Sequence, residues 1–202
     1  MNKYKHFDCL LIDLDGVINI TEKNGNYLWK ETREEDLGIP NEIIDEFFIN
    51  YWKPVVLGEI SMKQQLSNHL MKYNLENRTQ DIIEYFIDKN TIIDERILSI
   101  LQETDLPIYL ASDLNKERLD FYWDELNLKN LFDDKFISCE MGVKKSKKEF
   151  FEQVIEVIDI KPEKILFIDD DEKNTIIAKE CGLQSHYYQS YDDAYNQIFK
   201  DL

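Results

Sequence analysis

Two aspartates separated by one residue, Asp13 and Asp15, form the first group in this chain that could do chemistry. They follow a short apolar run at residues 9–12, which predicts a buried strand, and Gly16 then allows a sharp turn. Crowded carboxylates repel each other and raise each other's pKa unless a cation neutralises them. The motif therefore indicates a metal site, a general acid–base pair or both, although Asp-Gly after a strand is also ordinary turn chemistry.

Three further apolar runs predict strands, and each of them is followed by polar side chains. These strands are expected at residues 108–111, 136–139 and 165–168. The polar side chains that follow them are Ser112 and Asp113, then Lys145, and finally Asp169, Asp170 and Asn174. The carboxyl ends of parallel strands meet at one edge of an open α/β sheet, where such sheets bind ligands. With Asp13 and Asp15, these groups would supply a nucleophile, cation-binding acids, a hydroxyl for phosphate and a neutralising lysine, as phosphoryl transfer requires.

In order and in content, these motifs resemble those of the haloacid dehalogenase superfamily of phosphotransferases. The family's first motif is similar to Asp13-Leu14-Asp15-Gly16-Val17, its second to Ser112, its third to Lys145, and its fourth to Asp169-Asp170 with Asn174. The resemblance extends from about residue 7 to residue 188. Residues 52–61 also resemble the helical cap of the subgroup that contains small sugar-phosphate phosphatases.

The resemblance implies that Asp13 and Asp15 act on the phosphorus and on the leaving group. Asp13 is expected to attack the phosphorus and form an aspartyl-phosphate, which neighbouring cations make possible. Asp15 is expected to protonate the leaving alcohol and then to take a proton from the water that hydrolyses the intermediate. Dehalogenases of this superfamily lack an acid at this position, so Asp15 favours C–O–P cleavage over carbon–halogen cleavage.

The resemblance also implies a Mg²⁺ site. Its ligands are expected to be the side chains of Asp13 and Asp169 and the backbone carbonyl of Asp15, since Mg²⁺ prefers hard oxygen ligands and keeps several waters. Asp170 and Asn174 are expected to lie behind these ligands, where Asp170 would orient the lysine or a metal-bound water.

Ser112, Asp113 and Lys145 are expected to bind the substrate's phosphate. Ser112 would hydrogen-bond a phosphate oxygen together with backbone N–H groups around Asp113, and Lys145 would neutralise the incoming charge. Two structural alternatives stay open: Ser112 and Asp113 could cap a helix that starts near residue 115, and Lys145 could be one of four surface lysines. Asp113 and Ser146 depart from the family pattern, which often has asparagine and proline at these positions.

These motifs favour a Mg²⁺-dependent phosphatase that hydrolyses a small phosphorylated metabolite, for instance a sugar phosphate, through an aspartyl-phosphate. One alternative is a phosphomutase, which returns the phosphoryl group to a bound sugar. Another is a non-catalytic protein that binds phosphate or metal and keeps the fold. A phospho-signalling receiver uses similar groups, but in a different order and without a large insertion after the first strand.

The alternation of strands with helical patterns predicts an α/β fold: a doubly wound, Rossmann-like parallel sheet with a small helical cap inserted after the first strand. We expect the catalytic core at residues 1–18 and 92–202, and a flap and helical cap at residues 19–91. The insertion begins with an Asn24-Gly25 hairpin signal. Helices are expected at residues 41–50, 61–73 and 78–90 in the insertion and at residues 116–126, 147–158 and 174–181 in the core, with a fifth strand at 186–188.

Composition limits the partners that this chain can have. Its 202 residues include 24 basic and 41 acidic ones, which give a formal net charge of −17. This charge argues against nucleic acid and anionic membranes as partners, and a small-molecule phosphate ester is expected instead. The three cysteines share no metal-ligand spacing, and no stretch predicts a membrane span or a signal peptide. We therefore expect a cytoplasmic location, whereas the sequence carries no signal for oligomeric state.

Overall fold

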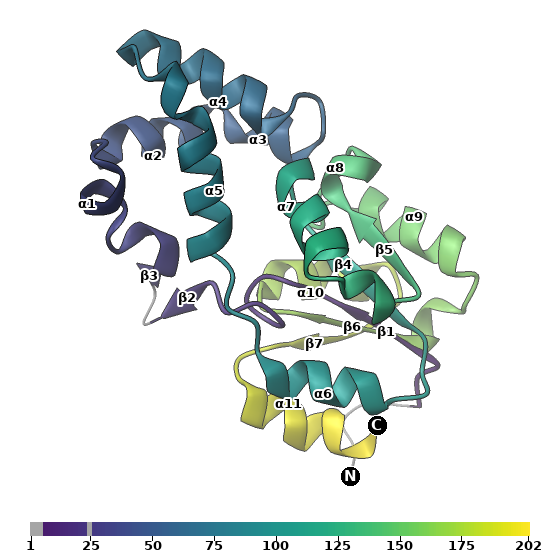
Figure 1. The fold of residues 1–202 in the computed structure, drawn as a ribbon. Coiled ribbons are helices and arrows are strands. Elements are labelled where there is room, and N and C mark those ends of the chain that lie inside the picture. Colours follow the sequence, from purple (N-terminus) through teal and green to yellow (C-terminus); the bar gives the residue numbers. More distant parts are fainter. Residues whose placement is uncertain (1–5, 24–25) are drawn as a thin grey trace.

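A parallel sheet of five strands forms the centre of the computed structural model, which describes residues 6–23 and 26–202 (Figure 1). The strands lie in the order β5-β4-β1-β6-β7, and all neighbours in it are parallel. They are β1 (Cys9–Ile12), β4 (Ile108–Ser112), β5 (Asp134–Ile137), β6 (Ile165–Asp169) and β7 (Gln184–Tyr187). Because the chain order reverses at β1, the predicted doubly wound α/β fold is confirmed.

Different helices cover the two faces of this sheet. Leu10 and Ile12 of β1 belong to one apolar cluster and Cys9 and Leu11 to another, as expected for a strand that is buried on both faces. Helices α6 and α11 pack in the first cluster, and α9 and α10 in the second (Figure 1). The helices of the core are α6 (Glu95–Glu103), α7 (Lys116–Asp120), α8 (Ser138–Met141), α9 (Lys148–Ile158), α10 (Glu172–Glu180) and α11 (Tyr191–Gln197).

Between β1 and β4 the chain forms a hairpin and helices α1–α5, which together we call the cap. The hairpin strands are β2 (Glu22–Lys23) and β3 (Asn26–Tyr27), and the helices are α1 (Arg33–Leu37), α2 (Asn41–Asn50), α3 (Trp52–Val56), α4 (Met62–Leu70) and α5 (Thr79–Lys89). The cap has an apolar cluster of its own, which includes Trp29, Phe47 and Phe86. The predicted Asn24-Gly25 turn lies outside the described residues, and the expected domain boundaries stay a prediction.

Local capping and hydrogen bonding set several element boundaries that the apolar runs did not predict. The strand expected at residues 136–139 ends at Ile137, because Ser138 begins α8. Helix α10 begins at Glu172 rather than at residue 174, since the side chain of Asp171 accepts a backbone N–H two residues on and caps it. Helices α1, α3, α6 and α11 were not among the expected helices, and α1 and α3 span only five residues each.

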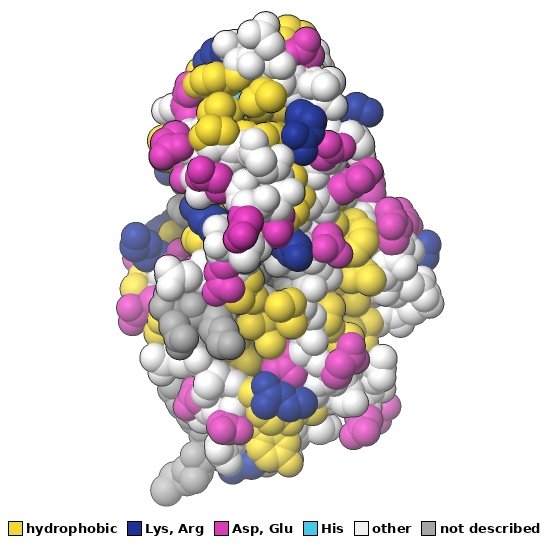
Figure 2. Space-filling model, turned by 60° about the vertical axis from the view of Figure 1, so that its left-hand side comes forward, with side chains coloured by type: hydrophobic (Ala, Val, Ile, Leu, Met, Phe, Trp, Pro, Cys, Tyr) yellow, Lys and Arg dark blue, Asp and Glu magenta, His cyan; other side chains and the backbone are white. Residues whose placement is uncertain are grey.

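The surface of the molecule carries its negative charge over both cap and core. Figure 2 shows acidic side chains spread across the visible face rather than gathered in one place. None of the described helices is long and apolar enough to cross a bilayer.

Ser138 and Gly58 join the cap to the core in addition to the two chain connections. The Ser138 hydroxyl donates to the carbonyl of Val56, at 2.8 Å, and both residues are buried. Gly58 has a φ of +74°, and a Cβ built on it would lie 2.0 Å from the carbonyl oxygen of Cys139. The backbones of α3 and α8 can therefore meet only because residue 58 has no side chain.

Replacement of Gly58 by alanine should destabilise the protein far more than the same change at Gly38. Gly38 also has a positive φ, of +64°, but a Cβ there meets nothing within 4 Å. We expect Gly38→Ala to lower the free energy of unfolding by about 1 kcal/mol, because alanine disfavours this backbone conformation. Gly58→Ala should cost about 1–3 kcal/mol more, because the backbones must separate. Urea unfolding of both variants measures the difference, and equal losses would contradict the close contact.

Candidate active site

Three charged side chains that are distant in sequence meet at the carboxyl edge of the sheet. Nζ of Lys145 lies 2.6 Å from Oδ1 of Asp13 and 2.7 Å from Oδ2 of Asp169. Asp13 directly follows β1, Asp169 ends β6, and Lys145 lies in the loop between α8 and α9. All three side chains are buried, with that of Lys145 only 4% exposed. The structure thus brings these predicted residues to one point.

Burial and charge strongly perturb this cluster. Burial raises the pKa of Asp13 well above its usual range; Lys145 opposes this shift, whereas Asp169 and Asp170 reinforce it. Burial also disfavours the charged form of Lys145, but Asp13 and Asp169 outweigh burial and raise the pKa of this lysine. One lysine is thus shared among several carboxylates, so a further positive charge would stabilise the ionised form of the cluster.

The carboxylates of Asp13, Asp169 and Asp170 could hold a metal ion. One oxygen of each lies within 4.8 Å of the others, and carboxylate oxygens are hard donors of the kind that Mg²⁺ prefers. Asp170 was predicted to lie behind the ligands, but its oxygen belongs to the same group of donors. Gly16 permits this proximity: a Cβ on it would lie 1.8 Å from Oδ2 of Asp170. The expectation that the backbone carbonyl of Asp15 is a further metal ligand stays a prediction.

Backbone and amide hydrogen bonds fix the orientation of Asp169 and Asp13. Oδ1 of Asp169 accepts the backbone N–H of Asp171 at 2.7 Å. The side-chain amide of Asn174 donates to both oxygens of Asp169, at 3.2 and 3.3 Å. Oδ1 of Asp13 accepts the N–H of Leu14 at 2.7 Å. Asn174 therefore positions Asp169 from the opening turn of α10.

Ser112 and Asp113 differ in what they contact. Ser112 ends β4, is buried and lines the cavity next to Asp13. Asp113 accepts the backbone N–H of Lys145 at 3.1 Å and lies 3.5 Å from Nζ of Lys144, so its carboxylate holds the loop that carries the buried lysine. Helix α7 instead starts with Asn115 at its N-cap, without a side-chain cap hydrogen bond. Asp113, which stands where the family often has asparagine, therefore has a structural role in this chain: it holds the loop of Lys145.

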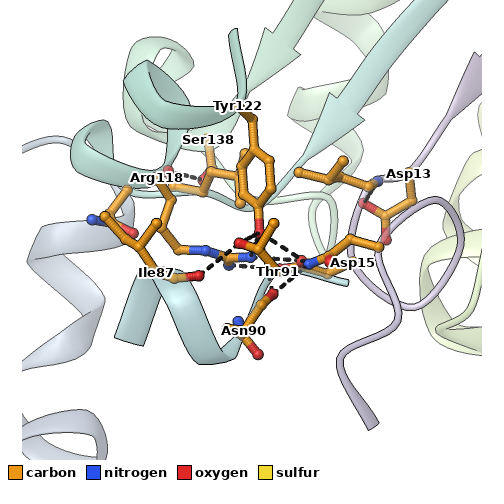
Figure 3. Close-up of polar contacts among 12 residues, drawn as sticks. Asp13, Asp15, Ile87, Asn90, Thr91, Arg118, Tyr122 and Ser138 are labelled. Carbon is orange, nitrogen blue, oxygen red and sulfur yellow. Dashed lines mark hydrogen bonds and ion pairs between the residues drawn. The ribbon is translucent and has the colours of Figure 1, made fainter. Parts of the chain in front are cut away.

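Arg118 holds Asp15 in a two-point ion pair. Its Nη1 lies 2.6 Å from Oδ2 of Asp15 and its Nη2 lies 2.7 Å from Oδ1, while Asn19 donates to Oδ1 at 2.8 Å (Figure 3). Burial of Asp15 opposes ionisation, but Arg118 outweighs it and lowers the pKa of Asp15. Asp15 is therefore ionised in this arrangement.

The same network reaches the chain segment that connects the cap to α6 of the core. Asn19 donates to the carbonyl of Asn90 at 2.7 Å and accepts the N–H of Ile92 at 2.8 Å. Tyr122 donates to the same carbonyl at 3.2 Å and accepts from Arg118 at 3.0 Å (Figure 3). One chain connection of the cap thus contains Asn19, a partner of Asp15, and the other is hydrogen-bonded to Asn19 and Tyr122.

Asp13, Asp15, Arg118 and Lys145 line one cavity of about 430 Å³ between the sheet edge and the cap. The basic groups of its lining are Lys30, Arg118 and Lys145, and the acidic ones are Asp13, Asp15, Glu22, Asp113, Asp170 and Asp171. Because these six acids outnumber three bases among the described residues, an anionic phosphate would be repelled unless a cation joined it. The charge balance therefore fits a site that uses a divalent metal ion.

A comparison with protein-family models decides the family. Residues 7–182 match the model of the haloacid dehalogenase-like hydrolases. The chain belongs to this family. The match covers the sheet from β1 to β6 and the whole cap, so the resemblance predicted from the motifs is confirmed.

Two curated relatives of this haloacid dehalogenase-like hydrolase match only in part. A sesquiterpene phosphatase of Aspergillus oryzae is 31% identical over 99 residues, which cover 45% of this chain and 47% of that protein. A drimenol cyclase of Aspergillus calidoustus is 22% identical over 155 residues, which cover 73% of this chain and 29% of that protein. The chain spans less than half the length of these curated relatives.

Solved structures share the whole fold. A predicted HAD-like family hydrolase from Porphyromonas gingivalis superposes with a TM-score of 0.79, at 21% identity, over 97% of this chain and 98% of that one. A magnesium complex of a HAD family enzyme from Bacteroides thetaiotaomicron superposes with a TM-score of 0.77, at 23% identity, over 94% and 96%. At these identities the likeness shows the fold alone.

Sequence reasoning missed Arg118 and part of the role of Tyr122 in this haloacid dehalogenase-like hydrolase. Both residues lie in the helix expected at residues 116–126, which was given no part in the site. Tyr122 is fully buried, yet its hydroxyl also joins the Asp15 network. The available signal was an arginine one helical turn before a buried tyrosine, on the helix that follows Ser112.

Proposed function

We propose that this chain is a Mg²⁺-dependent phosphatase that hydrolyses a phosphate monoester through an aspartyl-phosphate on Asp13. The observation that carries the proposal is the contact of Lys145 with both Asp13 and Asp169 at the floor of the cavity. The names of two relatives support the proposal. One is the sesquiterpene phosphatase, and the other is the HAD family enzyme from Bacteroides thetaiotaomicron, of which one structure holds magnesium and inorganic phosphate. We likewise propose residues 1–18 and 92–202 as the catalytic core and residues 19–91 as its flap and cap.

Asp13 performs the first step of this reaction. Its Oδ1 is engaged by Lys145 and by the N–H of Leu14, so we assign the attack to Oδ2. A bond forms between Oδ2 and phosphorus while the bond from phosphorus to the ester oxygen breaks. Lys145 and Ser112 neutralise and orient the phosphate oxygens, and the leaving alkoxide takes the proton that Asp15 carries at the start of this step.

Asp15 handles the protons. In the second step water adds to phosphorus, the bond from phosphorus to Oδ2 of Asp13 breaks, and Asp15 accepts the proton that water loses. The ion pair with Arg118 suits this role, because it keeps Asp15 ionised. For the first step Asp15 must carry a proton in place of part of its ion pair with Arg118, and the proton that it takes from water in the second step restores this state.

The donor set of Asp13, Asp169 and Asp170 fits Mg²⁺, with the backbone carbonyl of Asp15 proposed as a further ligand. When bound, the ion would neutralise charge on the transferring phosphoryl group. Asn174 and the backbone N–H of Asp171 hold Asp169 in place for it.

Removal of the metal should abolish the reaction. The purified chain is expected to release inorganic phosphate from phosphate monoesters only when Mg²⁺ is present. Chelation with EDTA should lower the rate by about 10²–10³-fold, and excess Mg²⁺ should restore it, because the metal contributes several kcal/mol to charge stabilisation. A colorimetric phosphate assay measures this. Full activity after chelation would refute the metal requirement, and transfer within the substrate without phosphate release would indicate a mutase.

A further inference from the structure

Four aromatic side chains form the cap side of the active-site cavity, and we call them the aromatic wall. They are Trp29, Phe48 of α2, Trp52 of α3 and Phe86 of α5. The ring of Trp29 lies 4.9 Å, between centroids, from the ring of Phe48 and also from the ring of Phe86. The rings of Phe48 and Trp52 lie 5.0 Å apart. The wall is thus one continuous apolar surface, built from four separate elements of the cap.

The aromatic wall adjoins the charged floor of the same cavity. Phe86 is 5.4 Å from the guanidinium carbon of Arg118, which in turn holds Asp15, so the wall begins where the floor ends. The charged and polar groups of the hairpin side, Glu22, Tyr27 and Lys30, are exposed and lie at the rim. A bound ester would therefore place its phosphate on the floor and its alcohol portion against the wall.

Two adjacent phenylalanines of α2 differ in role: one packs inside the cap and the other lines the cavity. Phe47 is fully buried in the cap and does not line the cavity, whereas the adjacent Phe48 is half-buried and does. Trp52 is also half-buried and lines the cavity. Trp29 and Phe86 are buried members of the cap's apolar core, so the part of the wall that is open toward the phosphate site is formed mainly by Phe48 and Trp52.

A sugar body would be poorly matched to the aromatic wall itself, because the other polar side chains of the cavity, among them Thr21, Tyr27 and Asn90, lie outside the wall. The only polar atoms that the aromatic side chains of the wall offer are two indole N–H groups. Each sugar hydroxyl that loses water without gaining a partner costs about 1–3 kcal/mol. An apolar body gains from the same contact, because burial of apolar surface is favourable and aromatic rings add dispersion contacts.

We infer that the substrate is the phosphate monoester of an apolar alcohol, with a hydrocarbon body that lies along the aromatic wall, rather than a sugar phosphate. This inference rests on the proposed phosphatase function and specifies its substrate class. The sequence motifs suggested a sugar phosphate as one example of a substrate, whereas the lining of the cavity favours an apolar ester.

A series of straight-chain alkyl phosphates tests the inference with the unmodified protein. Ethyl, butyl, hexyl and octyl phosphate, below their micelle concentrations, are compared with glucose 6-phosphate in the presence of Mg²⁺. We expect kcat/KM to rise about two- to fourfold per methylene until the cavity is filled, because a buried methylene is worth about fourfold. A flat series with glucose 6-phosphate as the best ester would overturn the inference and leave the phosphatase proposal standing. Phosphate release from none of these esters would overturn both.

A pair of tryptophan variants links the preference to the aromatic wall. Trp52→Leu removes part of the wall, while Trp123→Leu changes a similarly half-buried tryptophan in the helical segment Phe121–Glu125 that follows α7, stacked on Phe132 and outside the cavity lining. We expect the ratio of kcat/KM for octyl over ethyl phosphate to fall at least about fivefold in Trp52→Leu and to stay unchanged in Trp123→Leu. Because the ratio is internal to each variant, partial loss of folded protein does not affect it. Equal ratios in both variants would overturn the inference.

Discussion

Asp13→Asn is expected to lower phosphate release by at least about 10³-fold, since an amide cannot form the aspartyl-phosphate. The variant should fold, because an amide oxygen can still accept the N–H of Leu14 and contact Lys145, which retains Asp169 as a partner. Acid quenching of the wild-type reaction should trap one phosphoryl group on the protein, detectable by mass spectrometry. The variant should show none.

A surface aspartate provides the control for this experiment. Asp105 is exposed and lies outside the cavity lining, so Asp105→Asn should leave the rate within about twofold of the wild type. If Asp13→Asn retained turnover and a trapped phosphoryl group, Asp13 would not be the nucleophile. The carboxylate cluster would then have to act through another residue.

Arg118→Met is expected to have the second largest effect, on both activity and stability. It leaves Asp15 partly buried without its ion-pair partner, which should lower the free energy of unfolding by about 3 kcal/mol. A displaced Asp15 should lower kcat/KM about 10²-fold, because errors of about 1 Å in a reacting group cost that much. Arg96→Met is the matched control: Arg96 also contacts both oxygens of an aspartate, Asp94, but its side chain is 60% exposed.

A double mutant separates positioning from mere structural support. In an Asp15→Asn background, adding Arg118→Met should lower kcat/KM by less than about threefold, because no carboxylate is left to position. The loss in stability should be smaller as well. An equal further loss of kcat/KM in both backgrounds would show that Arg118 acts through something other than Asp15.

The strands and the cluster around Asp13 could be predicted because local patterns encode them. β1 is buried on both faces, so its residues form an uninterrupted apolar run whose bounds were predicted correctly. The edge strand β5 instead begins with Asp134 and Lys135, which the apolar pattern does not include. Strand ends also predict that Asp13 and Asp169 meet, since parallel neighbours place their carboxyl ends together.

The remainder of the site depends on contacts that no local pattern contains. Arg118 and Asp15 are 103 positions apart, and a charged residue on an amphipathic helix is usually solvated. Phe47 and Phe48 are equally apolar in sequence, yet only the packing of α2 against its neighbours decides which one lines the cavity. The chemistry of the floor could therefore be predicted, whereas the nature of the wall could not.

The hydrogen bond from Ser138 to Val56 has a consequence for substrate choice. Movement of the cap about its two chain connections would break this buried hydrogen bond, at a cost of about 1–3 kcal/mol, so the closed arrangement is favoured. The dimensions of the cavity are then largely preorganised when the chain folds, before any ester arrives. Such a rigid enclosure loses little entropy on binding and discriminates by the length and shape of the alcohol.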